Sequence, residues 1–427
     1  MKDQQTLVPM SKFSDLGLDK SIVSAVTAQG YEQPTAIQIQ AIPAVLARKD
    51  IMAGAQTGTG KTAAFALPIL ENLRQNIPDN RQVRALVLTP TRELAQQVYK
   101  SFIKYAENTE LRIGVAYGGV SINPQISQIN QGLDVLVATP GRLLDHLING
   151  SLSLEKIETI VFDEADRMLD LGFKDEIDRI LNRAPAERQT LLFSATFDDE
   201  IFKLSKRLLV DPVLIEIGER NAAAAKVEQI VYTVDSDRKR ELTSYLIGSK
   251  NWQQVLIFTR TKQGADALAK EMSKDGIKTQ SIHGDKSQGA REKALADFKA
   301  GSIRALVATD VAARGLDISD LQTVINYELP YIAEDYIHRI GRTGRAGKNG
   351  LALSLMSPDE EWLLEAVEKV LDKRLLQQWF PGYEPDLNKA SKHSNKRVVS
   401  KQTARQQALG IKTKSAARTK SKQGRRR

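Results

Sequence analysis

Short apolar runs rich in β-branched residues recur along the chain, and each is followed by a segment with helix-like character. Continuous apolar runs are typical of strands that are buried on both faces. Their alternation with helices predicts an α/β fold with parallel sheets, whose ligands bind at the carboxyl ends of the strands. The runs are Asp50–Ala53, Ala85–Leu88, Val135–Ala138, Thr159–Phe162, Thr190–Phe193, Val255–Phe258, Ala305–Ala308 and Val324–Tyr327.

We interpret these runs as two related α/β domains. Val135–Arg142 resembles Ala305–Asp310, with Arg314 a little further on, and Gly218–Lys226 between the two halves has no apolar periodicity. A short helix within one domain is the alternative for that stretch. The predicted parts are a first domain at 1–217, a linker at 218–226, a second domain at 227–387 and a tail at 388–427.

The basic charge of the chain is concentrated in residues 388–427. This segment holds eight lysines, six arginines and no acid, so it carries +14 and, against a total of +9, the rest of the chain carries −5. Because it has few apolar side chains to bury in a core, we expect it to be disordered. Such a tail either solubilises the protein or binds polyanions through counterion release, and the absence of acids favours the second role.

Composition excludes several classes of protein. A hydrophobic content of 41% is enough for real cores, but no apolar run reaches the roughly 18 residues that a membrane span needs. The first residues lack the apolar core of a signal peptide. Without cysteine there is no disulfide, thiolate nucleophile or zinc finger. We therefore expect a soluble, cytoplasmic protein.

A glycine-rich sequence, Ala55–Thr62, follows the first apolar run and precedes a helical segment. Loops of this pattern hold nucleotide phosphates with backbone N–H groups and a helix N-terminus. Lys61 would reach the β- and γ-phosphates, and the Thr62 hydroxyl would bind Mg²⁺. The general pattern begins with glycine, where this chain has Ala55. The residues between are Gln56, Thr57, Gly58, Thr59 and Gly60.

Two adjacent acids, Asp163 and Glu164, stand at the end of the run Thr159–Phe162. Such a pair is usually a solvated turn, but a phosphate loop in the same chain favours a catalytic role. Asp163 would hold Mg²⁺, directly or through water, and Glu164 would orient and deprotonate the attacking water. The sequence thus predicts nucleotide hydrolysis.

Arg342 and Arg345 are three residues apart in the second half, so a helical turn would place them on one face. Guanidinium groups can neutralise charge that builds on the transferred phosphoryl group. A basic helix face for RNA is the alternative. Since the phosphate loop lies in the first half, the arginine hypothesis implies that catalysis needs both domains.

With these motifs in order, the chain resembles the DEAD-box ATP-dependent RNA helicases over roughly residues 11–386. The acidic motif is Asp163-Glu164-Ala165-Asp166, and Ala55 is common in this family's phosphate loop. Gly118–Gln125 and Pro381–Asp386 most resemble the bacterial RhlE-type subgroup. The resemblance implies two tandem RecA-like domains, with ATP and Mg²⁺ as cofactors.

The resemblance also assigns nucleotide and coupling residues. Gln38, in the stretch Gly30–Gln38, would pair with adenine, and Phe13 would stack on it, although Phe13 by itself is more typical of a core or staple residue. Gly315 and Asp317 would contact the ATP, the latter at its ribose. The coupling residues would be Asp166, Ser194, Thr196, His338 and Arg339.

The RNA contacts implied by the resemblance also lie at strand ends. Arginines, hydroxyls and glycine N–H groups suit a sugar-phosphate backbone, which carries no sequence information, and contacts to the 2′-OH would favour RNA over DNA. Taken singly, each of these segments could be an ordinary loop or helix cap without a role in RNA binding. The residues are Pro90, Thr91, Arg92, Gly118, Gly119, Thr139, Gly141, Arg142, Arg260, Gly284, Gln288, Arg291, Thr309, Asp310 and Arg314.

Our hypothesis is that ATP and RNA together close the two domains, bend one RNA strand and so open a short duplex locally. An ATP-gated RNA clamp, or a DNA helicase with the same core, remains an alternative. The sequence does not name the RNA, and ribosome assembly, RNA decay and cold adaptation are all compatible with it.

Overall fold

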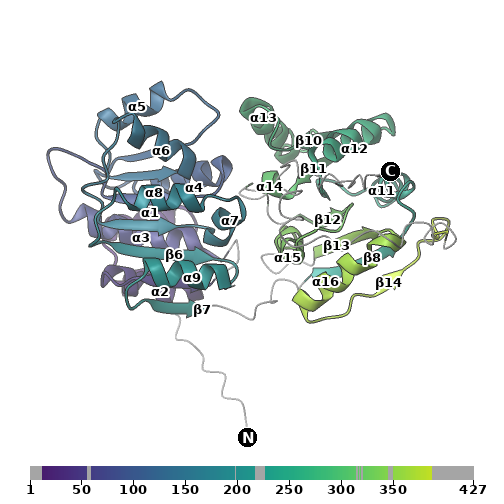
Figure 1. The fold of residues 1–427 in the computed structure, drawn as a ribbon, viewed down its shortest axis with the longest axis horizontal. Coiled ribbons are helices and arrows are strands. Elements are labelled where there is room, and N and C mark those ends of the chain that lie inside the picture. Colours follow the sequence, from purple (N-terminus) through teal and green to yellow (C-terminus); the bar gives the residue numbers. More distant parts are fainter. Residues whose placement is uncertain are drawn as a thin grey trace, which may run out of the picture. The chain divides into compact units, whose positions relative to one another are not determined.

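The computed structural model describes residues 12–54, 59–197, 199–216, 227–313, 316, 318, 321–344 and 350–386. They form two compact units, each built on one parallel sheet (Figure 1). The linker 218–226 and the tail 388–427 lie outside the described residues, so their boundaries stay predictions. Among the described residues, no helix is long and apolar enough to cross a membrane.

The first sheet has the order β3-β4-β2-β5-β6-β1-β7, and its neighbouring strands are all parallel. The five apolar runs of the first half are confirmed as strands. The edge strand β3 was not predicted. The strands are β1 Ile51–Gly54, β2 Ala85–Leu88, β3 Ile113–Ala116, β4 Val135–Ala138, β5 Thr159–Phe162, β6 Gln189–Ser194 and β7 Val213–Glu216.

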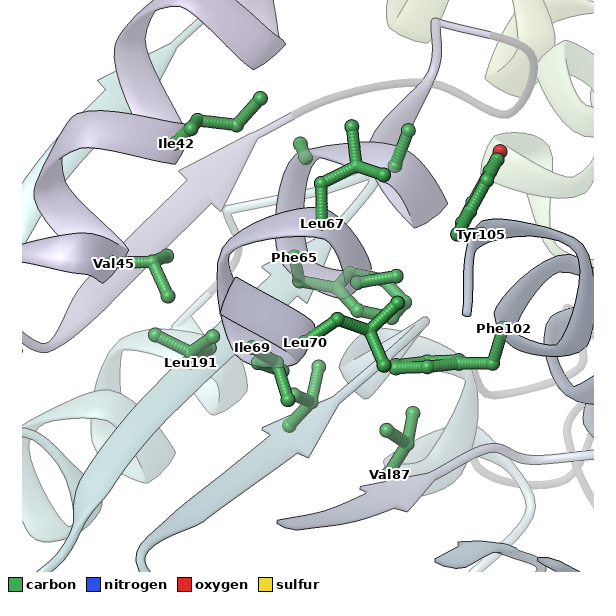
Figure 2. Packing of buried hydrophobic residues seen from close by; sticks show 14 of the residues in the cluster. Ile42, Val45, Phe65, Leu67, Ile69, Leu70, Val87, Phe102, Tyr105 and Leu191 are labelled. Carbon is green, nitrogen blue, oxygen red and sulfur yellow. The ribbon is translucent and has the colours of Figure 1, made fainter. Parts of the chain in front are cut away.

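Helices cover both faces of this sheet because successive strand residues point to opposite sides. Val87 packs with Phe65 and Phe102 in one apolar cluster (Figure 2), whereas Leu86 and Leu88 belong to a second cluster. The elements that join the strands are η1 Phe13–Leu16, α1 Lys20–Ala28, α2 Ala36–Leu46, α3 Lys61–Arg74, α4 Arg92–Tyr105, α5 Asn123–Asn130, α6 Pro140–Ile148, α7 Ala165–Asp170, α8 Lys174–Leu181 and α9 Asp199–Leu208.

The second sheet has the order β10-β11-β9-β12-β13-β8-β14, again with parallel neighbours. Renumbered from its first strand, this order is the same as that of the first sheet. The repeated topology confirms the fold class of two tandem α/β domains. The strands are β8 Val227–Thr233, β9 Val255–Thr259, β10 Thr279–Ile282, β11 Ala305–Thr309, β12 Thr323–Asn326, β13 Gly350–Met356 and β14 Gln377–Gln378.

The helices that connect the strands of the second sheet begin close to the carboxyl ends of those strands, as they do in the first sheet. One apolar cluster lies between α11, α12 and the sheet. The helices are α11 Lys239–Ser249, α12 Lys262–Lys274, α13 Gln288–Lys299, α14 Asp310–Ala313, α15 Ala333–Ile340, η2 Pro358–Glu360 and α16 Glu361–Leu371.

Candidate functional site

The predicted phosphate loop joins β1 to α3, and its last residues are described. Gly60 caps α3 in a left-handed conformation (φ 89°), which favours glycine. The next residue, Lys61, is only 7% exposed, and its Nζ has no hydrogen-bond partner. Gln56, Thr57 and Gly58 lie outside the described residues. A buried ammonium group without a partner is costly unless an anion neutralises it, so the position suits a phosphate.

Gln38 ties the start of α2 to this loop. Its Oε1 accepts a hydrogen bond from the Thr35 N–H at 2.9 Å, and its Nε2 donates to the Gly60 carbonyl at 3.1 Å. A Cβ at Gly60 would lie 2.4 Å from Gln38 Nε2, so the glycine also makes room for the amide. The Gln38 side chain therefore connects the start of α2 directly to the end of the phosphate loop.

Phe13, the residue that the resemblance assigns to adenine stacking, lies in the apolar core. It is 3% exposed and packs in the cluster that contains Leu16 and Ile42. The structure therefore places Phe13 where it can hold η1 against the domain. A stacking role would require one face of its ring to become accessible.

Asp163 follows β5 and is 3% exposed. Burial raises its pKa to about 6, the negative charges of Glu164 and Asp166 add to this, and the Lys61 ammonium opposes it. Its Oδ1 has no hydrogen-bond partner. An unpaired buried carboxylate oxygen, beside a buried ammonium, fits a site that binds a hard cation together with phosphates.

Glu164 is the N-cap of α7 and has a left-handed backbone, with φ 56° and ψ 54°. This conformation is strained for a residue with a Cβ, by roughly 1–2 kcal/mol. Glu164 is also 8% exposed. A strained, buried carboxylate next to Asp163 suits a general base better than a solvated surface turn.

Asp166 contacts the segment after β6. Its Oδ2 accepts hydrogen bonds from the Ala195 N–H at 3.2 Å and the Thr196 hydroxyl at 3.3 Å. The Ser194 hydroxyl does not bond to an acid; it donates to the Thr196 carbonyl at 2.7 Å. Ser194 thus shapes the turn, and Thr196 makes the link to the acidic motif.

The candidate RNA residues of the first unit gather beside β3, β4 and β2, which are neighbours in the sheet. Thr91 caps α4 and accepts from the Leu94 N–H at 3.3 Å, and Arg142 Nη2 donates to the Val120 carbonyl at 2.9 Å. The positions around them are Pro90, Arg92, Gly118, Gly119, Thr139 and Gly141.

Gly119 has a left-handed backbone and lies against the Arg92 guanidinium. Its φ is 77°, and a Cβ there would lie 1.8 Å from Arg92 Nη1. The Arg92 guanidinium therefore packs directly on the Gly119 backbone. This contact brings two of the predicted RNA elements together.

In the second unit, Arg339 and Asp310 are partners of each other. Arg339 Nε and Nη2 donate to the two Asp310 oxygens at 2.6 and 2.8 Å, and Nη1 donates to the Glu328 carbonyl at 2.6 Å. Arg339 is 1% exposed. The pair holds the start of α14 against α15, so both side chains are engaged within the unit.

Arg260, at the end of β9, is also engaged. Its Nη2 donates to Glu360 Oε1 at 2.5 Å, its guanidinium lies 4.7 Å from the centre of the Tyr331 ring, and Glu360 in turn accepts from Lys239 Nζ. Sequence reasoning missed Glu360 and Lys239. No local pattern points to them, because 100 residues separate Arg260 from Glu360.

The other candidates of residues 227–386 lie at strand ends, within helices or just after them. Arg342 is 6% exposed and Thr309, the last residue of β11, is 5% exposed. His338 lies on α15. Gly284 follows β10, while Gln288 and Arg291 are in α13. Arg314, Gly315, Asp317 and Arg345 lie outside the described residues.

Two parallel sheets of the same strand order, with a phosphate-loop helix and buried acids at strand ends of the first, define a tandem RecA-like ATPase. The DEAD/DEAH box helicase family matches residues 35–204, and the helicase conserved C-terminal domain matches residues 238–347. The chain belongs to the DEAD-box ATP-dependent RNA helicases, a class of ATP-hydrolysing enzymes.

The similarity to individual proteins supports the assignment to this family. The chain is 44% identical to the ATP-dependent RNA helicase CshA of Listeria monocytogenes, a match that covers 86% of this chain and 70% of that protein. It is 43% identical to the DEAD-box ATP-dependent RNA helicase RhpA of Helicobacter pylori, over 85% of this chain and 73% of that protein.

A solved structure of S. cerevisiae Dbp5 bound to RNA and ADP BeF3 is similar in fold. Its TM-score is 0.78 at 30% identity, and the match covers 89% of this chain and 98% of that one. The expectation of the DEAD-box family is therefore confirmed, whereas the two protein relatives carry the names CshA and RhpA rather than RhlE.

Proposed function

We propose that this chain opens short RNA duplexes, or remodels RNA–protein complexes, through ATP hydrolysis that RNA stimulates. The observation that carries the proposal is the pair of buried groups without partners, Lys61 Nζ and Asp163 Oδ1, beside the phosphate-loop helix. Such groups are costly to bury without partners, and a bound ligand can supply the partners. An ATP phosphate and a Mg²⁺ ion are the complementary charges.

Each nucleotide-site residue has a proposed role. Lys61 binds the β- and γ-phosphates, and Glu164 orients and deprotonates the attacking water. Mg²⁺, held by Asp163 and Thr62, would neutralise charge on the phosphates. Gln38 recognises adenine, with Phe13 stacked on it, and Gly315 and Asp317 contact the ATP on the side of the second domain. Arg342 and Arg345 stabilise the transferred phosphoryl group when the domains close.

RNA would be bound through its sugar-phosphate backbone, without sequence preference. Arg92, Arg142 and the glycine N–H groups of the first unit supply phosphate donors, and the second-unit candidates supply others. Asp166, Thr196 and His338 would couple closure to hydrolysis. Because closure would complete both sites, ATP and RNA would each favour binding of the other.

The finer assignment is also a proposal. Gly118–Gln125 and Pro381–Asp386 support an RhlE-like subgroup, and a phylogenetic tree built from both domains should place the chain there rather than with the CshA proteins. A cytoplasmic location and a role in ribosomal or RNA-decay assemblies fit an RNA helicase with a basic tail, and co-purification of native complexes tests them.

The test is steady-state ATP hydrolysis with no nucleic acid, with single-stranded RNA and with single-stranded DNA. RNA alone should stimulate the rate, and Glu164→Gln should bind ATP but hydrolyse it at least about 100-fold more slowly. Equal rates under all three conditions would refute RNA-driven closure. Normal hydrolysis by Glu164→Gln would refute the assignment of that residue.

A further inference from the structure

Gly54, the last residue of β1, lies against an aromatic ring. A Cβ built at Gly54 would lie 2.7 Å from Cζ and 2.8 Å from Cε2 of Phe197. Gly54 does not have a positive φ, so its backbone does not require glycine. The ring therefore occupies the space that a side chain at this position would need.

The position of Phe197 follows from the strand register. Gly54 pairs with Ser194 at the end of β6, and three residues later the chain brings Phe197 back over β1. Met52 and the partly buried Phe197 belong to the same apolar cluster, and alternate residues of a strand share a face. Phe197 thus covers the place where a side chain of Gly54 would point.

This ring joins two parts of the nucleotide site. On one side, Gly54 precedes Ala55, the first residue of the phosphate loop. On the other side, Phe197 follows Thr196, whose hydroxyl bonds to Asp166 at 3.3 Å. Phe202 also contacts the ring, with ring centres 6.0 Å apart. A shift of the Thr196 turn would therefore push on the origin of the loop.

We propose that Phe197 is a positioning residue for ATP: its contact with Gly54 sets where the phosphate loop begins relative to the Asp166–Thr196 link. The inference rests on the proposed function, because it assigns to Phe197 an effect on ATP binding at that site. Phe197 itself touches neither the nucleotide nor the reacting atoms.

A double-mutant cycle tests the contact. Gly54→Ala introduces a methyl group into the ring, so its KM for ATP should rise roughly fivefold, with a smaller change in kcat at saturating ATP and RNA. Phe197→Ala should also raise KM by roughly fivefold, because the loop loses its support. In the Phe197→Ala background, however, Gly54→Ala should have no further effect, since the ring that it would hit is gone.

Phe202→Ala is the matched control, because the Phe202 ring contacts the same ring at an interplanar angle of 47° and is 42% exposed. Its KM for ATP should stay within about twofold of wild type. Phe197→Leu, which keeps part of the contact, should lie between wild type and Phe197→Ala, and it replaces the latter if that variant unfolds. Thermal melting of every variant checks folding.

The inference is wrong if the KM increases of the two single variants multiply in the double variant. It is also wrong if Phe197→Ala leaves the KM for ATP unchanged. The wild-type protein in the same assay separates the two proposals. If it hydrolyses ATP with RNA stimulation but the cycle is multiplicative, only the role of Phe197 fails. If wild type does not hydrolyse ATP, the proposed function fails.

Discussion

At the scale of single residues, the nucleotide site stores unfavourable energy that a ligand would relieve. Asp163 and Lys61 are buried with unpaired polar atoms, and Glu164 has a left-handed backbone. Stability and function therefore compete at these positions. The sequence pattern pointed to all three residues as candidates, but it contained no information on their burial or strain.

Replacement of Asp163 by asparagine should stabilise the ligand-free protein. Its pKa is raised from 3.8 to about 6, so the native state disfavours ionisation, and stability is lost as the pH rises from about 4 to about 6. Asp163→Asn should regain at most about 3 kcal/mol at pH 8 while abolishing hydrolysis. Thermal unfolding from pH 5 to pH 8 measures this.

Asp79→Asn, at an exposed position, is the control for the loss of one charge. A difference between Asp163→Asn and wild type that does not grow with pH would contradict the buried-carboxylate explanation. So would an Asp163→Asn protein that melts below wild type at pH 8.

Gly119→Ala should weaken RNA binding by displacing Arg92. Both the methyl clash with the Arg92 guanidinium and the positive φ oppose alanine. We expect roughly tenfold weaker RNA binding, measured by fluorescence anisotropy, and an unchanged KM for ATP without RNA. Gly150→Ala is matched to it, because Gly150 has φ 74° but no neighbour within 4 Å. Equal losses of RNA affinity in both variants would mean that the strained backbone, and not the displacement of Arg92, causes the effect.

At the scale of elements, burial explains why several strands could be predicted from the sequence and why others could not. Central strands such as β2 and β5 are buried throughout, so their composition is continuously apolar. The edge strand β10, Thr279–Ile282, has a single strand neighbour and is mostly half-buried, so its residues Thr-Gln-Ser-Ile show no apolar run. The strand β8 mixes polar and apolar residues without a continuous apolar run, and only part of it is buried.

Contacts between elements were beyond prediction for a different reason. His146 on α6 contacts Gln125 Oε1 at 3.2 Å and Ser151 Oγ at 2.8 Å, and the Gln125 amide donates to the Tyr117 carbonyl at 3.1 Å. These links join the helix that carries Arg142 to the chain just before Gly118. Pairings of this kind are set by the tertiary fold, and no local spacing encodes them.

The His146 link should make the first unit sensitive to acid. Burial lowers the pKa of His146, and the positive charge of Arg142 adds to this, while Asp145 opposes it. A lowered histidine pKa gives stability that is present above pH 6.5 and is lost as the pH falls through the folded value. The melting temperature of His146→Asn should therefore fall less than that of wild type between about pH 7.5 and about pH 5, a range that includes the ordinary histidine pKa of about 6.5.

His393→Asn, outside the described residues, is the control for the loss of a histidine. It should follow the wild-type profile. Parallel profiles for His146→Asn and wild type would mean that protonation of His146 does not destabilise the fold.

At the scale of the whole molecule, the charge of the chain is divided between two parts with different tasks. Residues 1–387 carry a net charge of −5, against +14 in residues 388–427 and +9 in total. Backbone recognition by the two domains depends on positioned donors, whereas a basic segment attracts RNA through long-range electrostatics. The tail should therefore govern encounter with RNA more than ATP chemistry.

Removal of residues 388–427 should reduce the salt dependence of RNA binding. Each phosphate contact that is lost makes the slope of log K against log salt shallower by about 0.7 for single strands, because fewer counterions are released. The measurement compares the full chain with residues 1–387 on one single-stranded RNA, without nucleotide, over a series of salt concentrations. A full-length variant with every tail Lys and Arg replaced by Gln keeps the length and should behave like the truncation. Parallel slopes for all three proteins would show that the tail does not contact RNA, and the backbone contacts of the two domains would then account for all of the affinity.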